Sequence, residues 1–394
     1  MKILILTPDI YTRGGIARYT WTLASALGDL IGPENVHVLA FLNTENSQEG
    51  PKAFRVLGAI ADRPTATAKM KFAAKAVAKA RKKYDLVICA HVALAPIAAA
   101  IRLLYGTPFW VACHGIEVWG RLPLVERLAL QRADRVAPIS RFTAQMVTRV
   151  NGVSPKMISI LHNAISDEFA RLLARLEEPS PTASCGGHQK TIFSVGMLSK
   201  ALSYKGFDTM IRVLPRVLEA VPDVRYVIAG DGDNRQDLQK LAFEFGVGNH
   251  VEFKGEVPND ELAALYHACD VFVLPSRTRE EKGSWQGEGF GRVYVEAALA
   301  GKPVVGSRDG GAAEAVLDGQ TGILVDPASE AEVVAALISL LGNPGLAARM
   351  GREGRRWAQE NFTQTALRRQ LGQMLTNLPG APRESASLCA ESSE

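Results

Sequence analysis

The chain of 394 residues repeats one pattern many times: a short apolar run, a polar turn and then a longer amphipathic segment. In the first block the short runs are apolar nearly throughout, which is typical of strands covered on both faces. They lie at 2–7, 36–42, 85–91, 108–114, 134–139 and 157–161, with helical patterns at 16–27, 68–83, 124–133 and 141–150. This alternation predicts an α/β fold with a parallel, doubly wound sheet.

The alternation stops at 177–190, where Pro, Ser and Gly predict a linker, and then restarts. Strands are predicted at 191–195, 224–229, 250–253, 271–274, 303–306 and 322–325, and helices at 207–220, 235–245, 260–268, 291–300, 310–317, 330–341 and 344–361. We therefore predict two Rossmann-like domains, 1–176 and 191–362, facing a ligand cleft. A helix at 364–378 is expected to pack back on the first domain, and the tail 379–394 to be disordered.

Composition excludes several classes of protein. A net charge of +4 is too small to indicate a nucleic-acid partner. The five cysteines are scattered and show no metal-ligand spacing, so a reducing cytoplasm is the default expectation. The first apolar run ends at Leu6, too short for a signal peptide, and the run 93–101 is far short of a membrane span.

One stretch, 283–301, combines a glycine-rich turn with two glutamates, Glu288 and Glu296. The glycine-rich turn lies between a predicted strand and a predicted helix. Backbone N–H groups and the positive end of a helix dipole favour an anion at such a turn. Two carboxylates beside it can accept hydrogen bonds from hydroxyl groups. A sugar nucleotide, which offers both a diphosphate and hydroxyl donors, fits this description.

Two loops of the first domain also follow predicted strands, where ligands bind in doubly wound sheets. Gly14 and Gly15 let a ligand approach the backbone closely, and His114 can bond a sugar hydroxyl or a phosphate. Taken singly, a tight turn and an ordinary histidine are the commoner explanations. The glycine loop is not G-x-G-x-x-G and no acid follows for a nicotinamide ribose, so a dehydrogenase is disfavoured.

Four loops of the second domain share this position at strand ends. Lys200 and Lys205 follow the first strand and can neutralise a diphosphate. The turn at 230–232 can admit a nucleobase against the backbone, and Lys254 and the segment 309–314 follow further strands. Each of these loops is a weak signal alone. For Lys200 and Lys205, for example, two solvated lysines on a loop are the simpler explanation. Their common position is what indicates a shared site.

These residues carry a resemblance. The run Glu288-Gly-Phe-Gly-Arg-Val-Tyr-Val-Glu296 resembles the Glu-x7-Glu motif of the retaining GT-B glycosyltransferases of family GT4. Further groups match that family in order: Gly14-Gly15, His114-Gly115, Lys205-Gly206, Gly230-Asp231-Gly232, Pro275-Ser276 and Thr321-Gly322. The resemblance spans residues 3 to 362 and implies transfer of a hexosyl group from a nucleotide-diphosphate sugar, GDP-mannose or a UDP-hexose.

The resemblance also implies a role for each matching residue. His114 would bond the donor sugar, Lys205 would stabilise the departing diphosphate, and Glu288 would contact the sugar near its 3-hydroxyl. The implied donor-binding positions are Gly14, Gly15, Lys200, Gly230, Gly232, Lys254, Gly289, Phe290, Gly291 and Glu296, of which Glu296 accepts the ribose hydroxyls. No metal or other cofactor is implied, since cationic side chains supply the positive charge.

One position departs from the family. Met197 stands where family members usually carry an arginine, and Lys200 is expected to supply the missing charge from nearby. Arg292, directly after the glycine turn, either contributes to that charge or points to solvent. Without that charge the leaving group is stabilised less, which predicts reduced activity or an altered donor. The alternative to a glycosyltransferase is a sugar-nucleotide-binding protein with little or no turnover, and Met197 is its best support. A GT-B phosphorylase or epimerase is the competing enzyme class, but nothing singles out a Schiff-base lysine.

The segment 69–83 is basic and holds no acid, and Phe72, Ala76, Ala80 and Tyr84 recur at a spacing of four. Such a helix can lie on an anionic membrane, but a solvated helix packed by its alanines is the favoured interpretation. Membrane contact would indicate a lipid-linked acceptor and a peripheral location on the inner face; a glycan acceptor is equally compatible with the resemblance. Both fit envelope polysaccharide or glycolipid synthesis, and the sequence indicates no oligomeric state.

Overall fold

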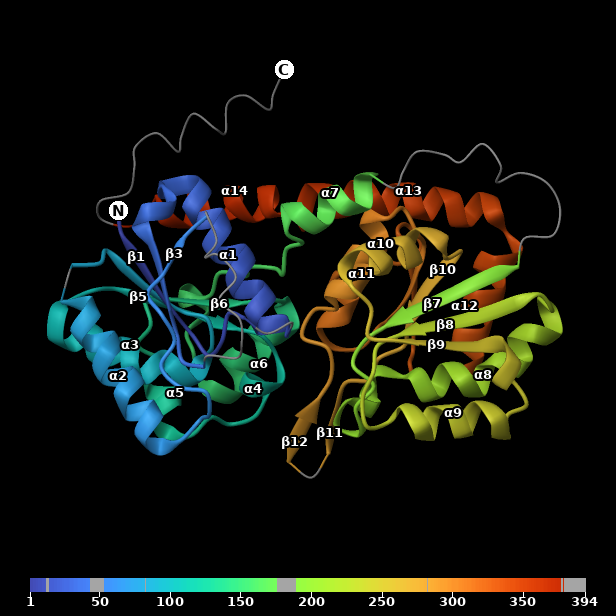
Figure 1. Cartoon of the computed structure of the whole chain (residues 1–394), viewed down its shortest axis with the longest axis horizontal. Helices are drawn as coiled ribbons and strands as arrows, with labels where there is room; N and C mark the ends of the chain where they lie inside the picture. The colour runs from blue at the N-terminus through green and yellow to red at the C-terminus, as the bar shows by residue number, and fades with distance from the viewer. Residues whose placement is uncertain are drawn as a thin grey trace, which may run out of the picture. The chain divides into compact units, whose positions relative to one another are not determined.

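The computed structural model describes residues 1–11, 14–42, 53–81, 83–175, 189–281, 283–376 and 378 (Figure 1). Two compact units divide this chain: Met1–Ala164 with the helix that begins at Gln364 form unit 1, and Ile165–Thr363 form unit 2. Each unit is built on a six-stranded parallel sheet, which confirms the predicted fold class. The predicted tail 379–394 and nearly all of the predicted linker lie outside the described residues.

The sheet of unit 1 has the order β3-β2-β1-β4-β5-β6. All of its neighbouring pairs are parallel. Its central strands are buried throughout, because helices cover both faces and leave no polar side for water. The strands are β1 (Ile3–Thr7), β2 (Val36–Ala40), β3 (Arg55–Val56), β4 (Leu86–Cys89), β5 (Phe109–Cys113) and β6 (Arg135–Pro138).

Helices cover the two faces of this sheet in separate groups (Figure 1). On one face α1 (Gly15–Ile31) packs against α14 (Gln364–Leu375). On the other face α2 (Ala66–Ala80) packs against α3 (Ala95–Tyr105), and α3 packs against α5 (Leu124–Leu130). The chain builds the sheet outward from β1 in two directions, first through β2 and β3 and then through β4, β5 and β6. Because crossovers between parallel strands are right-handed, the helices of these two halves lie on opposite faces of the sheet. Two further helices are α4 (Ile116–Trp119) and α6 (Arg141–Asn151).

Unit 2 repeats the architecture with the strand order β14-β13-β10-β7-β8-β9, again parallel throughout. Its strands are β7 (Lys190–Val195), β8 (Val224–Ala229), β9 (Val251–Gly255), β10 (Val271–Leu274), β13 (Val304–Ser307) and β14 (Gly322–Val325). Its helices are α7 (Asp167–Arg175), α8 (Phe207–Ala220), α9 (Arg235–Glu244), α10 (Asn259–Ala268), α11 (Arg292–Leu299), α12 (Glu330–Gly342) and α13 (Pro344–Asn361).

The boundary between the units lies at Ala164, not at 176 as the sequence predicted. Helix α7 belongs to unit 2 because it packs on α10 and α11 and buries Phe169 and Leu173. His267 of α10 and the carbonyl of Leu173 are hydrogen-bonded at 2.7 Å. An amphipathic helix belongs to the unit that covers its apolar side, and only the contacts reveal which unit that is.

The local structure differs from the sequence prediction at several places. The predicted strand 157–161 is wrong: a 3-10 turn at Pro155–Met157 precedes a single bridge between Ile158 and Val136. The predicted helix 310–317 is a short 3-10 turn, Gly310–Glu314, because two adjacent glycines open it. A hairpin of β11 (Arg279–Glu281) and β12 (Ser284–Gln286) was not predicted, since its exposed polar strands carry no hydrophobic alternation.

Helix α2 turns its apolar side inward. Phe72, Ala76 and Ala80 are buried, which is the packed helix that the sequence favoured. Among the described residues, no single helix is both long and apolar enough to cross a membrane. Helices α12 and α13 meet that test only as a pair, and a bend of 100° separates them.

Replacing Leu371 with alanine should destabilise unit 1. Leu371 is fully buried where α14 covers α1, so the cavity should cost about 2–5 kcal/mol of unfolding free energy. Urea unfolding followed by circular dichroism measures the loss. Thr365→Ala on the exposed side of α14 is the matched control and should change the midpoint little. Equal effects of the two substitutions would contradict the packing described.

Candidate active site

The loops that follow the strands of unit 2 are hydrogen-bonded to one another at the carboxyl edge of the sheet. The Leu198 N–H, after β7, donates to Asp231 O, after β8, at 2.9 Å. The Arg277 N–H, after β10, donates to Tyr204 O at 2.7 Å. The Gly311 N–H, after β13, donates to Glu288 O at 3.2 Å. Parallel strands end at the same edge, so the predicted loops do meet there.

Two of the predicted catalytic residues in unit 2 form an ion pair. The Lys205 ammonium donates to Oε1 of Glu288, and both side chains are largely buried. The ammonium also lies over the ring of Tyr204, 5.6 Å from its centroid. Burial raises the pKa of Tyr204, and the Glu288 carboxylate adds to the rise. The pair places one positive and one negative group beside the glycine turn.

The loop carrying Lys205 is held in place from β10. Gly206 has φ +81°, and a Cβ there would lie 2.4 Å from the carbonyl oxygen of Pro275, so the approach requires glycine. The Arg277 guanidinium binds Asp208 at 2.7 Å, at the start of α8. Arg277 was not predicted as a site residue, although its place directly after a strand is the signal that could have identified it.

The glycine turn ends where α11 begins. Gly291 caps α11 with φ +79°, and Phe290 is buried against the ring of Phe362 at a centroid distance of 5.2 Å. Gly289 lies between Glu288 and Phe290 in the same turn. The Tyr294 N–H donates to Gly291 O at 3.0 Å. The first backbone N–H groups of a helix lie at the positive end of its dipole, which suits an anion.

Glu296 lies in α11 and is only 2% exposed. Its Oε1 accepts a hydrogen bond from Arg292 Nε at 2.9 Å, and its Oε2 accepts one from the hydroxyl of Tyr266 at 2.9 Å. Burial raises the pKa of Tyr266 well above its usual value, and the nearby Glu296 carboxylate adds to the rise. The spacing of four places Arg292 and Glu296 on the same side of the helix and permits their pairing, whereas no sequence signal identifies Tyr266.

The glycines after β8 are required by close approach of the loop after β7. A Cβ on Gly230 would lie 2.0 Å from Gly196 O, and one on Gly232 would lie 2.3 Å from Leu198 O. The Gly230 N–H donates to Gly255 O at 2.7 Å. This bond joins the loop to the end of β9, which carries Lys254.

The two lysines predicted for donor binding, Lys200 and Lys254, and also Arg292 are engaged inside unit 2. The Lys254 ammonium pairs with Glu252 of the same strand. Lys200 pairs with Asp237 of α9 at 2.7 Å, an exposed pair, and Arg292 faces Glu296. Met197 is 60% exposed and brings no charge. Over the described ranges, no group of three or more His, Cys, Asp or Glu side chains is placed to hold a metal ion.

The predicted residues of unit 1 lie at the carboxyl ends of β1 and β5. Gly14 caps α1, and a Cβ on Gly15 would meet no atom of the described residues within 4 Å. His114 Nε2 is hydrogen-bonded to Ala90 O at 2.7 Å, and its ring contacts Tyr19 of α1 edge-on at 4.8 Å. Among the residues that the structure describes, the buried Tyr19 hydroxyl has no hydrogen-bond partner. The donor-binding roles of Gly14, Gly15 and His114 stay predictions.

A second histidine neighbours His114. Burial lowers the pKa of His91, the carboxylate of Glu117 opposes this shift, and the charge of His114 lowers the pKa further. Glu117 also accepts a hydrogen bond from the His114 backbone N–H. The sequence did not single out His91 or Glu117, although both lie close to predicted strand ends.

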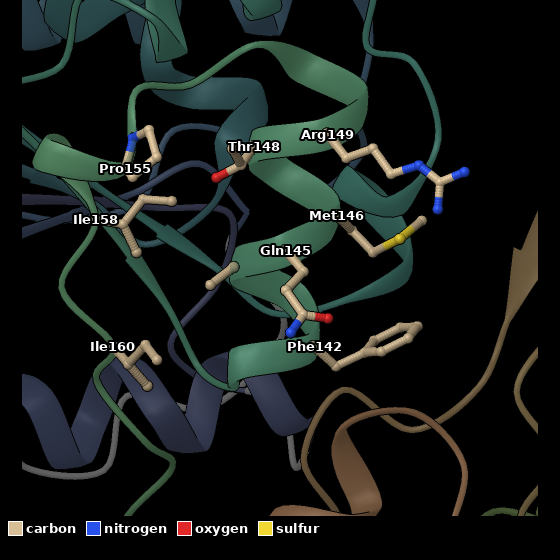
Figure 2. A pocket seen from close by; sticks show the side chains of 9 residues that line it. Phe142, Gln145, Met146, Thr148, Arg149, Pro155, Ile158 and Ile160 are labelled. Atoms are coloured by element: carbon tan, nitrogen blue, oxygen red, sulfur yellow. The ribbon is translucent and has the colours of Figure 1, made fainter.

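A pocket of about 640 Å³ lies elsewhere in unit 1, between α6 and the segment that follows it (Figure 2). Phe142 and Met146 of α6 and Ile158 and Ile160 beyond it give the pocket apolar walls, and Arg149 is its charged group. None of the predicted site residues lines this pocket, so it is not part of the predicted donor site.

Comparison with known proteins identifies the class. Residues 186–357 match the family described as Glycosyl transferases group 1, and residues 13–169 match Glycosyltransferase Family 4. The fold is that of the GT-B glycosyltransferases: the Anabaena protein HepE in complex with UDP superposes with a TM-score of 0.75 at 21% identity, covering 96% of this chain and 100% of HepE. The family matches and the fold thus define a glycosyltransferase that uses a nucleotide sugar.

Relatives place the chain within that class. It is 37% identical over 280 residues, 68% of each chain, to a GDP-mannose-dependent alpha-(1-6)-phosphatidylinositol monomannoside mannosyltransferase of Mycolicibacterium smegmatis. It is 28% identical over 391 residues, 96% of this chain and 97% of the relative, to a GDP-mannose-dependent monoacylated alpha-(1-6)-phosphatidylinositol monomannoside mannosyltransferase of Corynebacterium glutamicum. The protein belongs to glycosyltransferase family 4, which confirms the resemblance stated from the sequence.

Replacing Gly291 with alanine should destabilise unit 2 by about 1–3 kcal/mol, because a side chain resists this backbone conformation. The added Cβ would also lie 2.4 Å from Cδ2 of Tyr294. Denaturant unfolding measures the effect. Gly342→Ala, where a Cβ meets nothing within 4 Å, is the matched control and should be neutral or slightly stabilising. A neutral Gly291→Ala would contradict the cap described here.

Proposed function

We propose that this protein is a retaining mannosyltransferase that moves a mannosyl group from GDP-mannose to a hydroxyl of a lipid-linked acceptor in envelope glycolipid synthesis. The Lys205–Glu288 pair beside the glycine turn is the observation that carries the proposal. The names of the relatives from Mycolicibacterium and Corynebacterium support the choice of donor and acceptor.

The transfer breaks the bond between the anomeric carbon and the diphosphate oxygen, and forms a bond from that carbon to the acceptor oxygen. Positive charge develops on the sugar ring and negative charge on the departing GDP. The Lys205 ammonium stabilises the diphosphate as this charge builds. The acceptor proton passes to the departing phosphate oxygen on the same face of the sugar, which retains the anomeric configuration. Glu288 is a ligand for the sugar hydroxyls and not a covalent nucleophile.

Glu296 has a separate task in the proposal. Each of its carboxylate oxygens uses one lone pair within unit 2, toward Arg292 and Tyr266, and keeps another for a ribose hydroxyl. Those two partners fix the orientation of the carboxylate before the donor arrives. Preorganisation of this kind reduces the entropy that binding loses.

The second candidate function is sugar-nucleotide binding with little or no turnover. The exposed Met197 favours it, because an uncharged side chain stands where a cation is expected. The two cations that were expected to replace that charge are paired with acids of unit 2: Lys200 with Asp237, and Arg292 with Glu296. A binding protein would hold GDP-mannose but release no GDP with any acceptor. The two candidates therefore differ in one measurable quantity, which is nucleotide release.

Lys205→Ala should lower turnover by about 100- to 1000-fold, since it removes a cation aimed at the leaving group. Release of GDP from GDP-mannose, measured with a phosphatidylinositol mannoside acceptor, checks this. Glu288→Gln should also lower turnover, because the sugar and Lys205 both lose a carboxylate partner. Lys240→Ala, on an exposed lysine of α9, is the control and should behave like the unaltered protein. Binding of GDP-mannose without release in the unaltered protein would favour the second candidate.

A donor panel tests the rest of the proposal. We expect release from GDP-mannose to exceed release from UDP-glucose, and nuclear magnetic resonance of the first-formed product to show the α configuration of the donor. A β product would disprove retention. The proposal requires no metal ion, so a chelator should leave the rate unchanged, and loss of activity that Mg²⁺ restores would contradict that part. A preference for UDP-glucose would reject the donor but keep the reaction class.

A further inference from the structure

The hairpin of β11 and β12 is inserted between two parts of the candidate active site. Its first strand follows Arg277, which binds Asp208 close to the loop that carries Lys205. Its second strand leads within two residues to Glu288, the partner of Lys205. Between these ends the two short strands extend away from the sheet of unit 2 (Figure 1). The hairpin is therefore an extension of the site and not a remote loop.

Tight packing fixes the base of the hairpin. The Thr278 N–H donates to Oδ2 of Asp309 at 3.3 Å. A Cβ on Gly287 would lie 2.5 Å from Oγ1 of Thr278, and a Cβ on Gly310 would lie 2.4 Å from the same atom. Glycine is needed at both positions because the backbone approaches Thr278 so closely. Both strands thus leave the site from a fixed position.

The register of the hairpin puts one aromatic and one acidic side chain on the same face. Trp285 lies directly opposite Glu280 in the antiparallel pair. Opposite residues share a face of a sheet, and successive residues of a strand alternate between faces. The other two pairs therefore lie on the second face: Arg279 with Gln286, and Glu281 with Ser284.

The two faces differ in how their polar groups are satisfied. On the second face Arg279 pairs with Glu281 at 3.2 Å and donates to Oε1 of Gln286 at 3.5 Å. On the first face the exposed carboxylate of Glu280 makes no hydrogen bond or ion pair with any residue that the structure describes. Trp285, its neighbour, is half-buried. The first face thus offers an indole ring and a carboxylate that can accept hydrogen bonds.

This combination suits a sugar ring. A pyranose presents C–H groups on one face, and these carry a slight positive charge that the negative face of an aromatic ring attracts. The hydroxyl groups at the edge of the same sugar are donors, and a carboxylate is an acceptor with several lone pairs. An aromatic ring and a neighbouring carboxylate can therefore hold one sugar by its face and its edge together.

The position of the hairpin selects the acceptor sugar, an inference that rests on the proposed function. Glu288 contacts the donor sugar in that proposal. Trp285 precedes it by three residues, which span at most about 10 Å of extended chain. The ring that lies next to the donor sugar during transfer is the acceptor. We propose that Trp285 and Glu280 form a subsite for the hexose ring of the acceptor, which stacks on the indole and donates to the carboxylate.

Kinetics with GDP-mannose and octyl α-mannoside as acceptor test the subsite. Trp285→Ala should raise the KM for octyl α-mannoside about tenfold, because the sugar loses its stacking surface, and should leave the KM for GDP-mannose unchanged. Trp285→Phe should keep most of the affinity, since a phenyl ring still presents an aromatic face. Glu280→Gln should raise the acceptor KM about fivefold, because a neutral amide accepts weaker hydrogen bonds than a carboxylate.

Matched controls separate the subsite from general effects on the hairpin and the surface. Glu281→Gln changes the same kind of side chain on the second face of the hairpin, and Phe243→Ala removes an 82% exposed aromatic ring of α9. Both variants should keep the acceptor KM of the unaltered protein. Glu280→Gln preserves the size of the side chain, so it tests the subsite even where Trp285→Ala fails to fold.

A binding measurement separates this inference from the proposed function. Saturation-transfer nuclear magnetic resonance with methyl α-mannoside and GDP requires no turnover, and we expect its signal to be lost in Trp285→Ala and kept in Glu281→Gln. Sugar binding through Trp285 without any release of GDP would reject the transferase and keep the subsite. An active protein whose acceptor KM is unchanged by Trp285→Ala and Glu280→Gln overturns the subsite alone. An equal rise in the KM for GDP-mannose also overturns it, since the hairpin would then bind the donor.

Discussion

The structure depends on strands that are buried on both faces. A parallel sheet can be completed only by helices that cross over its faces, so every crossover returns to the same edge. In unit 2 the loops after β7, β8, β10 and β13 therefore meet, and backbone hydrogen bonds join them. Glycines such as Gly206 and Gly230 are needed where these loops approach within van der Waals contact. The chemistry follows from this edge, since side chains distant in sequence converge only there.

The Lys205–Glu288 pair is the electrostatic centre of that edge. Each group offsets the desolvation of the other, so removing one leaves a largely buried charge without its partner. In the proposed function a diphosphate replaces Glu288 as the partner of Lys205 and frees the carboxylate for hydroxyl groups of a sugar. The second carboxylate works differently, because Arg292 and Tyr266 hold Glu296 from inside the unit. Two glutamates in one motif thus have different environments.

Sequence periodicity predicted nearly all strands of both sheets, because buried parallel strands are continuous apolar runs. It failed at 157–161, where Pro155 lacks a backbone N–H and the chain makes one bridge to β6. It also missed α3, whose start is marked by Pro96. Among the site residues, Glu288, Lys205 and the glycine turns were predicted from their places after strands. Arg277 and Tyr266 were not, since their roles arise from packing between loops and helices.

The sequence by itself determined the two α/β units, the strand-end loops and the family, because these depend on local periodicity and short motifs. Only the tertiary structure decided which residues pair: that Lys205 binds Glu288, that Arg292 faces Glu296 and not solvent, and that α7 belongs to unit 2. It also decided which apolar residues stay exposed, turning Phe72 inward and leaving Leu103 and Val125 at the surface. Hydropathy along the chain cannot separate these cases, because burial depends on which elements become neighbours in space.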